Sequence, residues 1–492
     1  VAGAMALSLC MPALAETWDM SNTEKYPTGE KARISVNRNE KDPDHPELNG
    51  QILTIWDSGG KDIEQKDEAP VLSGSFESLG LNCYDGTTVH ATLQDAHMEY
   101  NADSRHTLAA SGNVELTLNG SNTVTHNNTN KLAIDIDGNG WPRTPGLLTI
   151  KGSGSLTATN TLSSGIRIDN GTLDVTDGTV NVTAADNGIY ALGNTVQVSG
   201  GTLCATATGE HGIGIKASHN GQVTVSGGKL TASGGSYGIE ASENGRVTVS
   251  GGTLNASAKE TVAITGSSIT VNGGVLNLED NKAPVGILSK DLNVTNGWLT
   301  AKGQTVSANN ITVSGGVMEA GVLNCSQLNV SGGWVEADTL EPRESTIKLS
   351  GGNVKLKSVP DSSFIIHFSK RARLTITEPV SESDVRALVE AFENAQGVLY
   401  TTAYLRYKPA DYTAIPDDVG WDGIYVVYQG TQRDPDSNLA TDDNKPLLPS
   451  DIVEIGAAPE GDAGGAIAAV VLGSAAVWGG YEVVTRVILN EL

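Results

Sequence analysis

The sequence predicts an all-β protein whose strands stack in parallel as a solenoid, and three observations support this fold class. A phrase of alternating apolar and polar residues around a Gly-Gly turn recurs from VQVSGGTLCA to IKLSGGNVKL, at intervals of 17 to 27 residues. Aromatic residues make up only 5% of the 492 residues, whereas glycine occurs 58 times. Repeats this short cannot bury an apolar face alone and must stack. Because parallel crossovers are right-handed by default, we expect a right-handed parallel β-helix of about ten or more coils.

Each repeat is expected to contain three strands. A GIxI-type strand (SGIRI, NGIYA, HGIGIKA) comes first, a second strand leads into the Gly-Gly turn, and a third follows it. Strict alternation places every second residue of a strand in the core. The residues predicted to point inward are Val196, Val223, Val247, Ile269, Leu292, Ile311, Leu328 and Ile347, and, directly before the turns, Val198, Val225, Val249, Val271, Val294, Val313, Val330 and Leu349. The glycine pairs are expected to supply positive φ at a tight corner.

The outward positions after the turns include the candidate binding residues. Trp298 and Trp334 fall on one outward lane with Val317 between them, two coils and therefore about 9.6 Å apart. Indole faces at this spacing could stack on sugar rings. Two alternatives remain: a loop or the C-terminal cap covers the two indoles, or they form a protein contact.

Glu319 and Glu336 occupy the neighbouring outward lane on adjacent coils, about 5 Å apart, which is also the carboxylate spacing of a retaining glycosidase. The competing interpretation is that Lys355 on the next coil offsets the charge of Glu336 and that both carboxylates are solvated. His211 in GEHGIGI has no matching acidic pair. The sequence therefore predicts no catalytic residue, and a protein that is not an enzyme.

Asp135, Asp137 and Asn139 in DIDGNG are spaced like the first half of a calcium loop. The twelfth position, where an EF-hand needs glutamate, is Gly146. A turn of the solenoid is the favoured interpretation, and a calcium-braced loop is the alternative. We expect no cofactor otherwise.

Composition changes mark the domain boundaries. Residues 1–15 (VAGAMALSLCMPALA) read as the apolar half of a secretory signal peptide whose basic start is missing. SESDVRALVEAFENAQG, at 381–397, has the pattern of an amphipathic helix. The segments predicted to follow the signal peptide are an N-terminal cap with the first coils (16–110), the β-helix repeats (111–358), a small α+β C-terminal cap (359–430), an acidic linker (431–463) and a terminal apolar helix leading into a membrane span or wall anchor (464–492).

Charge and cysteine content exclude several classes of partner and stabilising device. Lys plus Arg number 32 against 57 Asp plus Glu, a net charge of −25, which argues against nucleic acid as a partner. Cys83, Cys204 and Cys325 are too widely separated to suggest a disulfide framework or a metal site.

The phrases VELTLNGSNTV and LLTIKGSGSLTA resemble those of right-handed β-helix carbohydrate-binding or adhesin-like modules in secreted proteins of gut Firmicutes. AAVWGGYEVVTRVILNEL resembles the lead-in to S-layer-homology-type anchors. The resemblance implies a secreted or extracellular cell-surface protein that binds polysaccharide or a host glycan along one face without catalysis, held to cell wall or membrane through its C-terminus. The alternatives are a polysaccharide lyase or glycosidase of the same fold, and a structural stalk that displays another module.

Overall fold

The computed structural model describes residues 16–22, 25, 31–39, 50–56, 62–84, 86–137, 145–278, 282–358, 365–368, 372–376, 392–393, 398–401, 403–407, 424–428, 446–447 and 452–457. The chain divides into two compact units. Unit 1 comprises Val1–Asn293 with Gly297–Thr300, and unit 2 comprises Val294–Asn296 with Ala301–Leu492. Strand β26 (Val285–Val313) contributes residues to both. Among the described residues every regular element is a β-strand, so the all-β prediction is confirmed.

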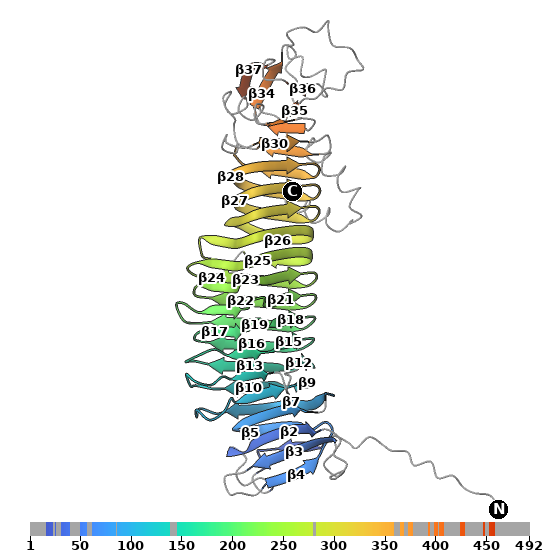
Figure 1. Cartoon of the computed structure of the whole chain (residues 1–492), viewed down its shortest axis with the longest axis vertical. Coiled ribbons are helices and arrows are strands. Elements are labelled where there is room, and N and C mark those ends of the chain that lie inside the picture. The colour runs from blue at the N-terminus through green and yellow to red at the C-terminus, as the bar shows by residue number, and fades with distance from the viewer. Residues whose placement is uncertain are drawn as a thin grey trace, which may run out of the picture. The chain divides into compact units, whose positions relative to one another are not determined.

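The repeats of unit 1 form three ladders of parallel strands, in which each strand pairs with its counterpart in the next repeat (Figure 1). Ladder A contains β9 (Asn113–Asn119), β12 (Gly146–Lys151), β15 (Gly171–Val175), β18 (Thr195–Val198) and β21 (Gln222–Val225). Ladder B contains β10 (Ser121–Thr125), β13 (Ser155–Asn160), β16 (Thr179–Ala184), β19 (Thr202–Ala207), β22 (Lys229–Gly234) and β24 (Thr253–Ala258). Ladder C contains β11 (Ile134–Asp137), β14 (Ile166–Asp169), β17 (Asn187–Tyr190) and β20 (Ile213–Lys216). The longer strands β23 (Tyr237–Val249) and β25 (Val262–Asn277) continue these ladders.

The N-terminal part of unit 1 departs from purely parallel pairing. Its strands are β1 (Thr17–Asp19), β2 (Arg33–Asn39), β3 (Gly50–Trp56), β4 (Asp62–Lys66), β5 (Val71–Phe76), β6 (Ser78–Cys83), β7 (Val89–Glu99) and β8 (Leu108–Ser111). Strand β3 pairs antiparallel with both β2 and β4, whereas β2 pairs parallel with β6. Trp18 is buried in this region, and its indole Nε1 donates a hydrogen bond to Asp67 Oδ2 over 2.9 Å. The buried aromatic side chains of the described residues, Trp18 and Phe76, both lie in this region.

The predicted division of side chains between core and surface is confirmed. Every residue of the two predicted inward sets is buried, with 2% exposure or less. The outward residues between them, such as Thr224 and Thr248, are half-buried on the surface of ladder A. Burying one Val, Leu or Ile side chain stabilises a fold by roughly 1.5–3 kcal/mol, so the stacked aliphatic rows hold the repeats together without aromatic residues.

The two glycines of each Gly-Gly turn have different roles. The second glycine has positive φ, as at Gly252 (+62°), whereas the first, Gly251, does not. A Cβ on Gly251 would instead overlap the backbone carbonyl oxygen of Ser226 in the preceding repeat. The expectation of positive φ is therefore correct for one glycine of the pair, and close stacking of the turns requires the other.

Unit 2 continues parallel pairing beyond residue 358, where the sequence predicts the solenoid to give way to an α+β cap. Its strands are β27 (Val317–Val330), β28 (Trp334–Leu349), β29 (Asn353–Leu356), β30 (Ile365–Phe368), β31 (Arg373–Ile376), β32 (Phe392–Glu393), β33 (Val398–Thr401), β34 (Ala403–Tyr407), β35 (Ile424–Tyr428), β36 (Pro446–Leu447) and β37 (Ile452–Ala457). One ladder runs through β27, β28, β29, β31, β33 and β35, and a second through β28, β30 and β32. Strands β34 and β37 form a separate antiparallel pair.

The prediction of a helix over 381–397 is wrong near its C-terminal end. Phe392 and Glu393 form strand β32, which pairs parallel with Ile366 and His367 of β30. Pairing with a neighbouring strand here outweighs the local helical pattern. Residues 381–391 and 394–397 lie outside the described residues, as do the signal-like segment 1–15 and the apolar segment 464–492. Of the linker predicted over 431–463, the structure describes only strands β36 and β37.

No helix in the described part of the chain has the length and apolar character needed to cross a bilayer.

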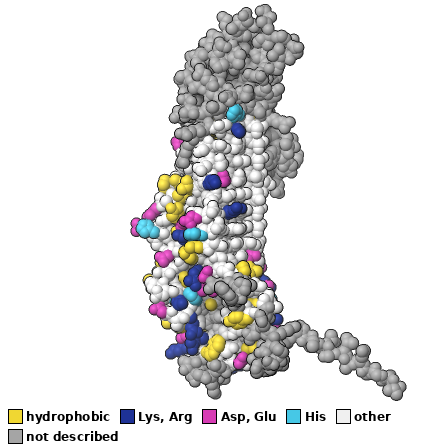
Figure 2. All heavy atoms as spheres, in the orientation of Figure 1, with side chains coloured by type: hydrophobic (Ala, Val, Ile, Leu, Met, Phe, Trp, Pro, Cys, Tyr) yellow, Lys and Arg dark blue, Asp and Glu magenta, His cyan; other side chains and the backbone are white. Residues whose placement is uncertain are grey.

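Surface charges of both signs are intermixed. Figure 2 shows acidic side chains next to basic ones on the face in view. On ladder A, Glu115 Oε1 lies 2.5 Å from Lys151 Nζ and 3.0 Å from His90 Nδ1, and these contacts lower the pKa of Glu115, with Lys151 as the larger cause. Cys204 is a half-buried thiol on the outward side of ladder B, as predicted, and Cys83 and Cys325 are buried thiols.

Candidate functional site

The candidate binding residues of unit 2 lie side by side on the outward face of β27 and β28. Val317 is paired in register with Trp334, and Glu319 with Glu336. Their side chains are all half-buried. The prediction that the two glutamates occupy adjacent strands of one lane is confirmed by this register. Parallel strands lie about 4.8 Å apart, so the carboxylates are close neighbours.

A lysine offsets the charge of each glutamate. Lys355 Nζ lies 3.0 Å from Glu336 Oε1, as the sequence suggested, and Lys302 Nζ lies 3.5 Å from Glu319 Oε1. Like charges on adjacent strands destabilise a sheet, and these ion pairs counter that repulsion. Lys302, Glu319, Glu336 and Lys355 together form what we call the Lys-Glu-Glu-Lys cluster, in which each carboxylate is ion-paired with a lysine.

Trp334 is fixed by the same cluster. Its indole Nε1 donates a hydrogen bond to Glu336 Oε2 over 3.3 Å, while Glu336 Oε1 accepts from Lys355. A half-buried indole held by its N–H keeps one orientation and presents a fixed ring face. Glu336 therefore positions the aromatic residue.

Lys302 is the member of this cluster that the sequence interpretation missed. It lies two residues after the outward-facing Thr300 on strand β26, so the same alternation would have placed it on the surface. Its pairing with Glu319 depends on the register of the following strand, which spacing alone does not give.

Trp298 belongs to unit 1, while Val317, Glu319, Trp334 and Glu336 belong to unit 2. Its side chain is 38% exposed, among the few large apolar side chains with such exposure in the described residues. The exposure of Trp298 agrees with its predicted outward position. The pairing of the two indoles as one platform stays a prediction.

The calcium candidate Asp135 is engaged by a guanidinium group and an imidazole. Asp135 accepts two hydrogen bonds from Arg167, Nε to Oδ1 at 2.8 Å and Nη2 to Oδ2 at 3.1 Å. His106 Nε2 lies 3.5 Å from the same Oδ2. Asp137 is the outward-facing end of β11, and Asn139 lies outside the described residues. No group of three or more His, Cys, Asp or Glu side chains suited to a metal ion occurs among the residues that the structure describes.

Acidification is expected to destabilise unit 1 through His106. Burial is the main cause that lowers the pKa of His106 from 6.5 to about 4. Its Nδ1 also accepts a hydrogen bond from the backbone N–H of Leu132 over 3.0 Å, which requires the neutral ring. The unfolded chain binds its proton near pH 6.5 and the folded chain near pH 4, so the free energy of unfolding falls as the pH decreases through this window.

Denaturant titrations between pH 7 and pH 4 measure this effect. His106→Gln should reduce the slope of the unfolding free energy against pH, because the substituted side chain does not titrate. The exposed His211 gives a matched substitution, and His211→Gln reports the effect of replacing a histidine that is not buried. An unchanged slope in His106→Gln contradicts the assignment.

Comparison of the sequence with protein-family models identifies the family of this chain. A family model described as carbohydrate-binding domain-containing protein matches residues 63–362, more than half of the chain. The match covers the repeats of unit 1 and, in unit 2, β27, β28 and β29 with Trp334 and Glu336. No curated protein and no solved structure matches the chain. The predicted resemblance to a carbohydrate-binding module is thus confirmed at the level of the family, and the chain belongs to the carbohydrate-binding domain-containing proteins.

Proposed function

We propose that this protein binds glycan on the outward face around Trp334 without transforming it. The observation that carries the proposal is the half-buried indole of Trp334, held by Glu336 within the residues that match the carbohydrate-binding family. A fixed aromatic face stacks on the apolar face of a sugar ring at little cost in conformational entropy. Glu319, Lys302 and Lys355 supply hydrogen-bonding groups next to that face.

The stacked parallel ladders support a right-handed β-helix as the scaffold of this face. Each strand pairs with its counterpart one repeat later, and parallel connections are right-handed by default. Such a scaffold repeats its surface every 4.8 Å or so, a spacing that suits a ligand that is itself a repeating chain.

The Lys-Glu-Glu-Lys cluster supports a binding role over hydrolysis. A retaining glycosidase needs one carboxylic acid and one free carboxylate nucleophile. Here Glu336 accepts hydrogen bonds from Trp334 and Lys355, and Glu319 is paired with Lys302. We infer a non-catalytic protein that needs no metal ion, and the signal-like segment 1–15 supports secretion to the extracellular surface.

Replacement of Trp334 by alanine tests the proposed function. We expect Trp334→Ala to weaken binding of the best neutral polysaccharide on a glycan array by roughly 1–3 kcal/mol, the loss typical of removing one stacking partner. Trp334→Phe should retain most of the affinity, because it keeps an aromatic face. Isothermal titration calorimetry measures both, and circular dichroism confirms that each variant is folded.

Three outcomes separate this function from its alternatives. Release of oligosaccharide products indicates a lyase or glycosidase. Absence of binding to any glycan favours a structural stalk. If Trp334→Ala leaves glycan affinity unchanged and Trp298→Ala weakens it, the binding site lies in unit 1.

A further inference from the structure

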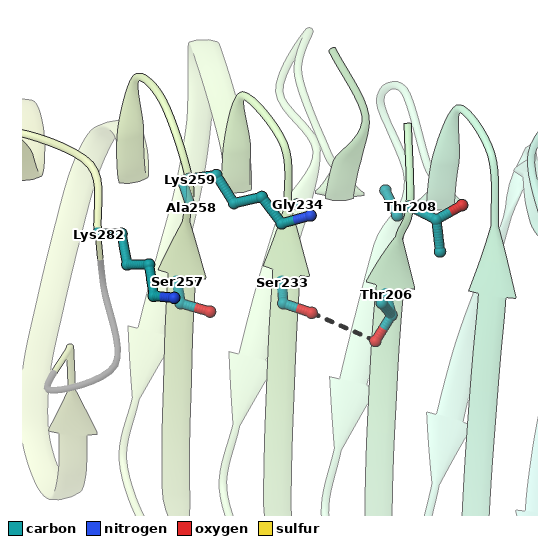
Figure 3. A pocket seen from close by; sticks show the side chains of 9 residues that line it. Thr206, Thr208, Ser233, Gly234, Ser257, Ala258, Lys259 and Lys282 are labelled. Carbon is teal, nitrogen blue, oxygen red and sulfur yellow. Dashed lines mark hydrogen bonds between the residues drawn. The ribbon is translucent and has the colours of Figure 1, made fainter. Parts of the chain in front are cut away.

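Unit 1 contains a second polar site, a pocket of about 250 Å³ where three strands of ladder B end (Figure 3). The strands are β19, β22 and β24, and the pocket opens beside the turns that follow them. Its lining consists of Thr206, Ala207, Thr208, Ser233, Gly234, Ser257, Ala258, Lys259 and Lys282. Hydroxyl and ammonium groups supply all of its polar side chains, and no carboxylate lines it among the residues described. This is unusual for a protein with a net charge of −25.

The hydroxyl groups form a regular row along the floor of the pocket. Thr206, Ser233 and Ser257 are register partners on successive strands. Ser233 Oγ donates a hydrogen bond to Thr206 Oγ1 over 3.2 Å, as Figure 3 shows. Ser257 lies one strand further along, and neighbouring strands are about 4.8 Å apart, so the whole row is within reach of one bound group.

The two lysines are carried on anchored backbone. The Lys259 N–H donates to Gly235 O over 3.0 Å, and the Lys282 N–H donates to Ala258 O over 3.1 Å, each one repeat back. Figure 3 shows the side chain of Lys259 lying towards Gly234 and that of Lys282 towards Ser257. The structure therefore presents two ammonium groups to the same row of hydroxyls.

Neither ammonium group has an ion-pair partner among the residues that the structure describes. The structure records no ion pair for Lys259 or Lys282 within its described residues, whereas Lys216 lies 3.4 Å from Glu240 and Lys151 lies 2.5 Å from Glu115. Two like charges on adjacent repeats repel one another. A bound anion would remove that repulsion and use the hydroxyl donors at the same time.

We propose that this pocket binds the tetrahedral oxyanion of a sulfate or phosphate ester carried by a glycan. Lysine ammonium groups bind phosphate as point charges, and an ester with three terminal oxygens offers one more acceptor than a carboxylate for two lysines and a row of hydroxyls. The serine and threonine hydroxyls donate to the remaining oxygen atoms. A volume of about 250 Å³ is small for a drug-sized ligand and fits one substituted sugar unit. The proposal rests on the proposed glycan binding and adds a second contact, with anionic substituents.

Dextrans with different substituents test the pocket. The full chain is titrated with dextran sulfate, phosphorylated dextran, carboxymethyl dextran of equal charge density and unmodified dextran. We expect the sulfated or the phosphorylated polymer to bind about tenfold or more tightly than the carboxymethyl polymer, with an affinity that falls as salt rises. The preferred ester identifies the source of the oxyanion.

Lysine variants locate the interaction. Lys259→Ala combined with Lys282→Ala should remove the gain from the ester group. The matched control is Lys229→Ala, because Lys229 is an exposed lysine at the start of β22 on the same ladder, outside the pocket lining. This control should leave binding unchanged.

Several results would overturn the inference. Equal binding of carboxymethyl and sulfated dextran shows only general attraction to positive charge, and an unaffected double variant shows that the pocket is not the site. If neutral glycans bind through Trp334 and an ester group adds no affinity, the ester-binding pocket is contradicted and the proposed glycan binding at Trp334 stands. Absence of binding to neutral glycans together with an ester-specific signal at the two lysines contradicts the Trp334 site and leaves the pocket standing.

Discussion

Val249→Asp is expected to lower the free energy of unfolding by roughly 4 kcal/mol or more, because it places an unpaired carboxylate among stacked aliphatic side chains. Val249 is fully buried in β23, between Val225 of β21 and Val271 of β25. Each of these neighbours is itself an apolar residue directly before a Gly-Gly turn, so no hydrogen-bond donor from this row could meet the carboxylate.

The neighbouring position is the control for this prediction. Thr248 precedes Val249 on the same strand, is half-buried and lies between the outward residues Thr224 and Thr270. Thr248→Asp should cost less than about 1 kcal/mol, because its carboxylate reaches solvent. Chemical denaturation followed by circular dichroism measures both variants, and equal losses would mean that the inward and outward assignment is shifted by one residue.

Gly252→Ala is expected to lower the free energy of unfolding by several kcal/mol. Gly252 has φ of +62°, and a Cβ there would overlap the backbone carbonyl oxygen of Gly228 in the preceding repeat. The substitution therefore adds backbone strain of about 1–3 kcal/mol to a steric overlap with main-chain atoms that cannot rotate away.

Two further glycines separate these two causes. Gly251→Ala brings only the overlap, with the carbonyl of Ser226, because its φ is not positive. Gly303→Ala brings only the strain, because φ is +69° there and no heavy atom beyond its two chain neighbours lies within 4 Å of the added carbon. Thermal unfolding should therefore show the largest loss at Gly252, and a Gly252→Ala variant as stable as Gly303→Ala would contradict the importance of turn stacking.

The sequence alone determined the strands of the repeats and the direction of their side chains. Successive side chains of a strand point to opposite faces whatever the rest of the chain does, so alternation in VTVSGGTLNA already separates Val247 and Val249 from Thr248. The outward placement of Trp298, Trp334, Glu319 and Glu336 follows from the same rule. The helix expected over 381–397 failed at Phe392, where a strand partner from β30 decided the conformation against the local pattern.

Only the tertiary structure decided which outward residues became partners. The repeats differ in length, from 17 to 27 residues, so the partners of a side chain depend on how each repeat is set in register against the next. Register brought Lys302 to Glu319 and Arg167 to Asp135. Lys259 and Lys282 lie outside the strands, where period-two alternation does not apply. Packing of successive repeats placed them beside one row of hydroxyls. Alternation is a property of one strand and can be read locally, whereas a binding site on stacked strands is a property of several repeats and exists only once they are packed together.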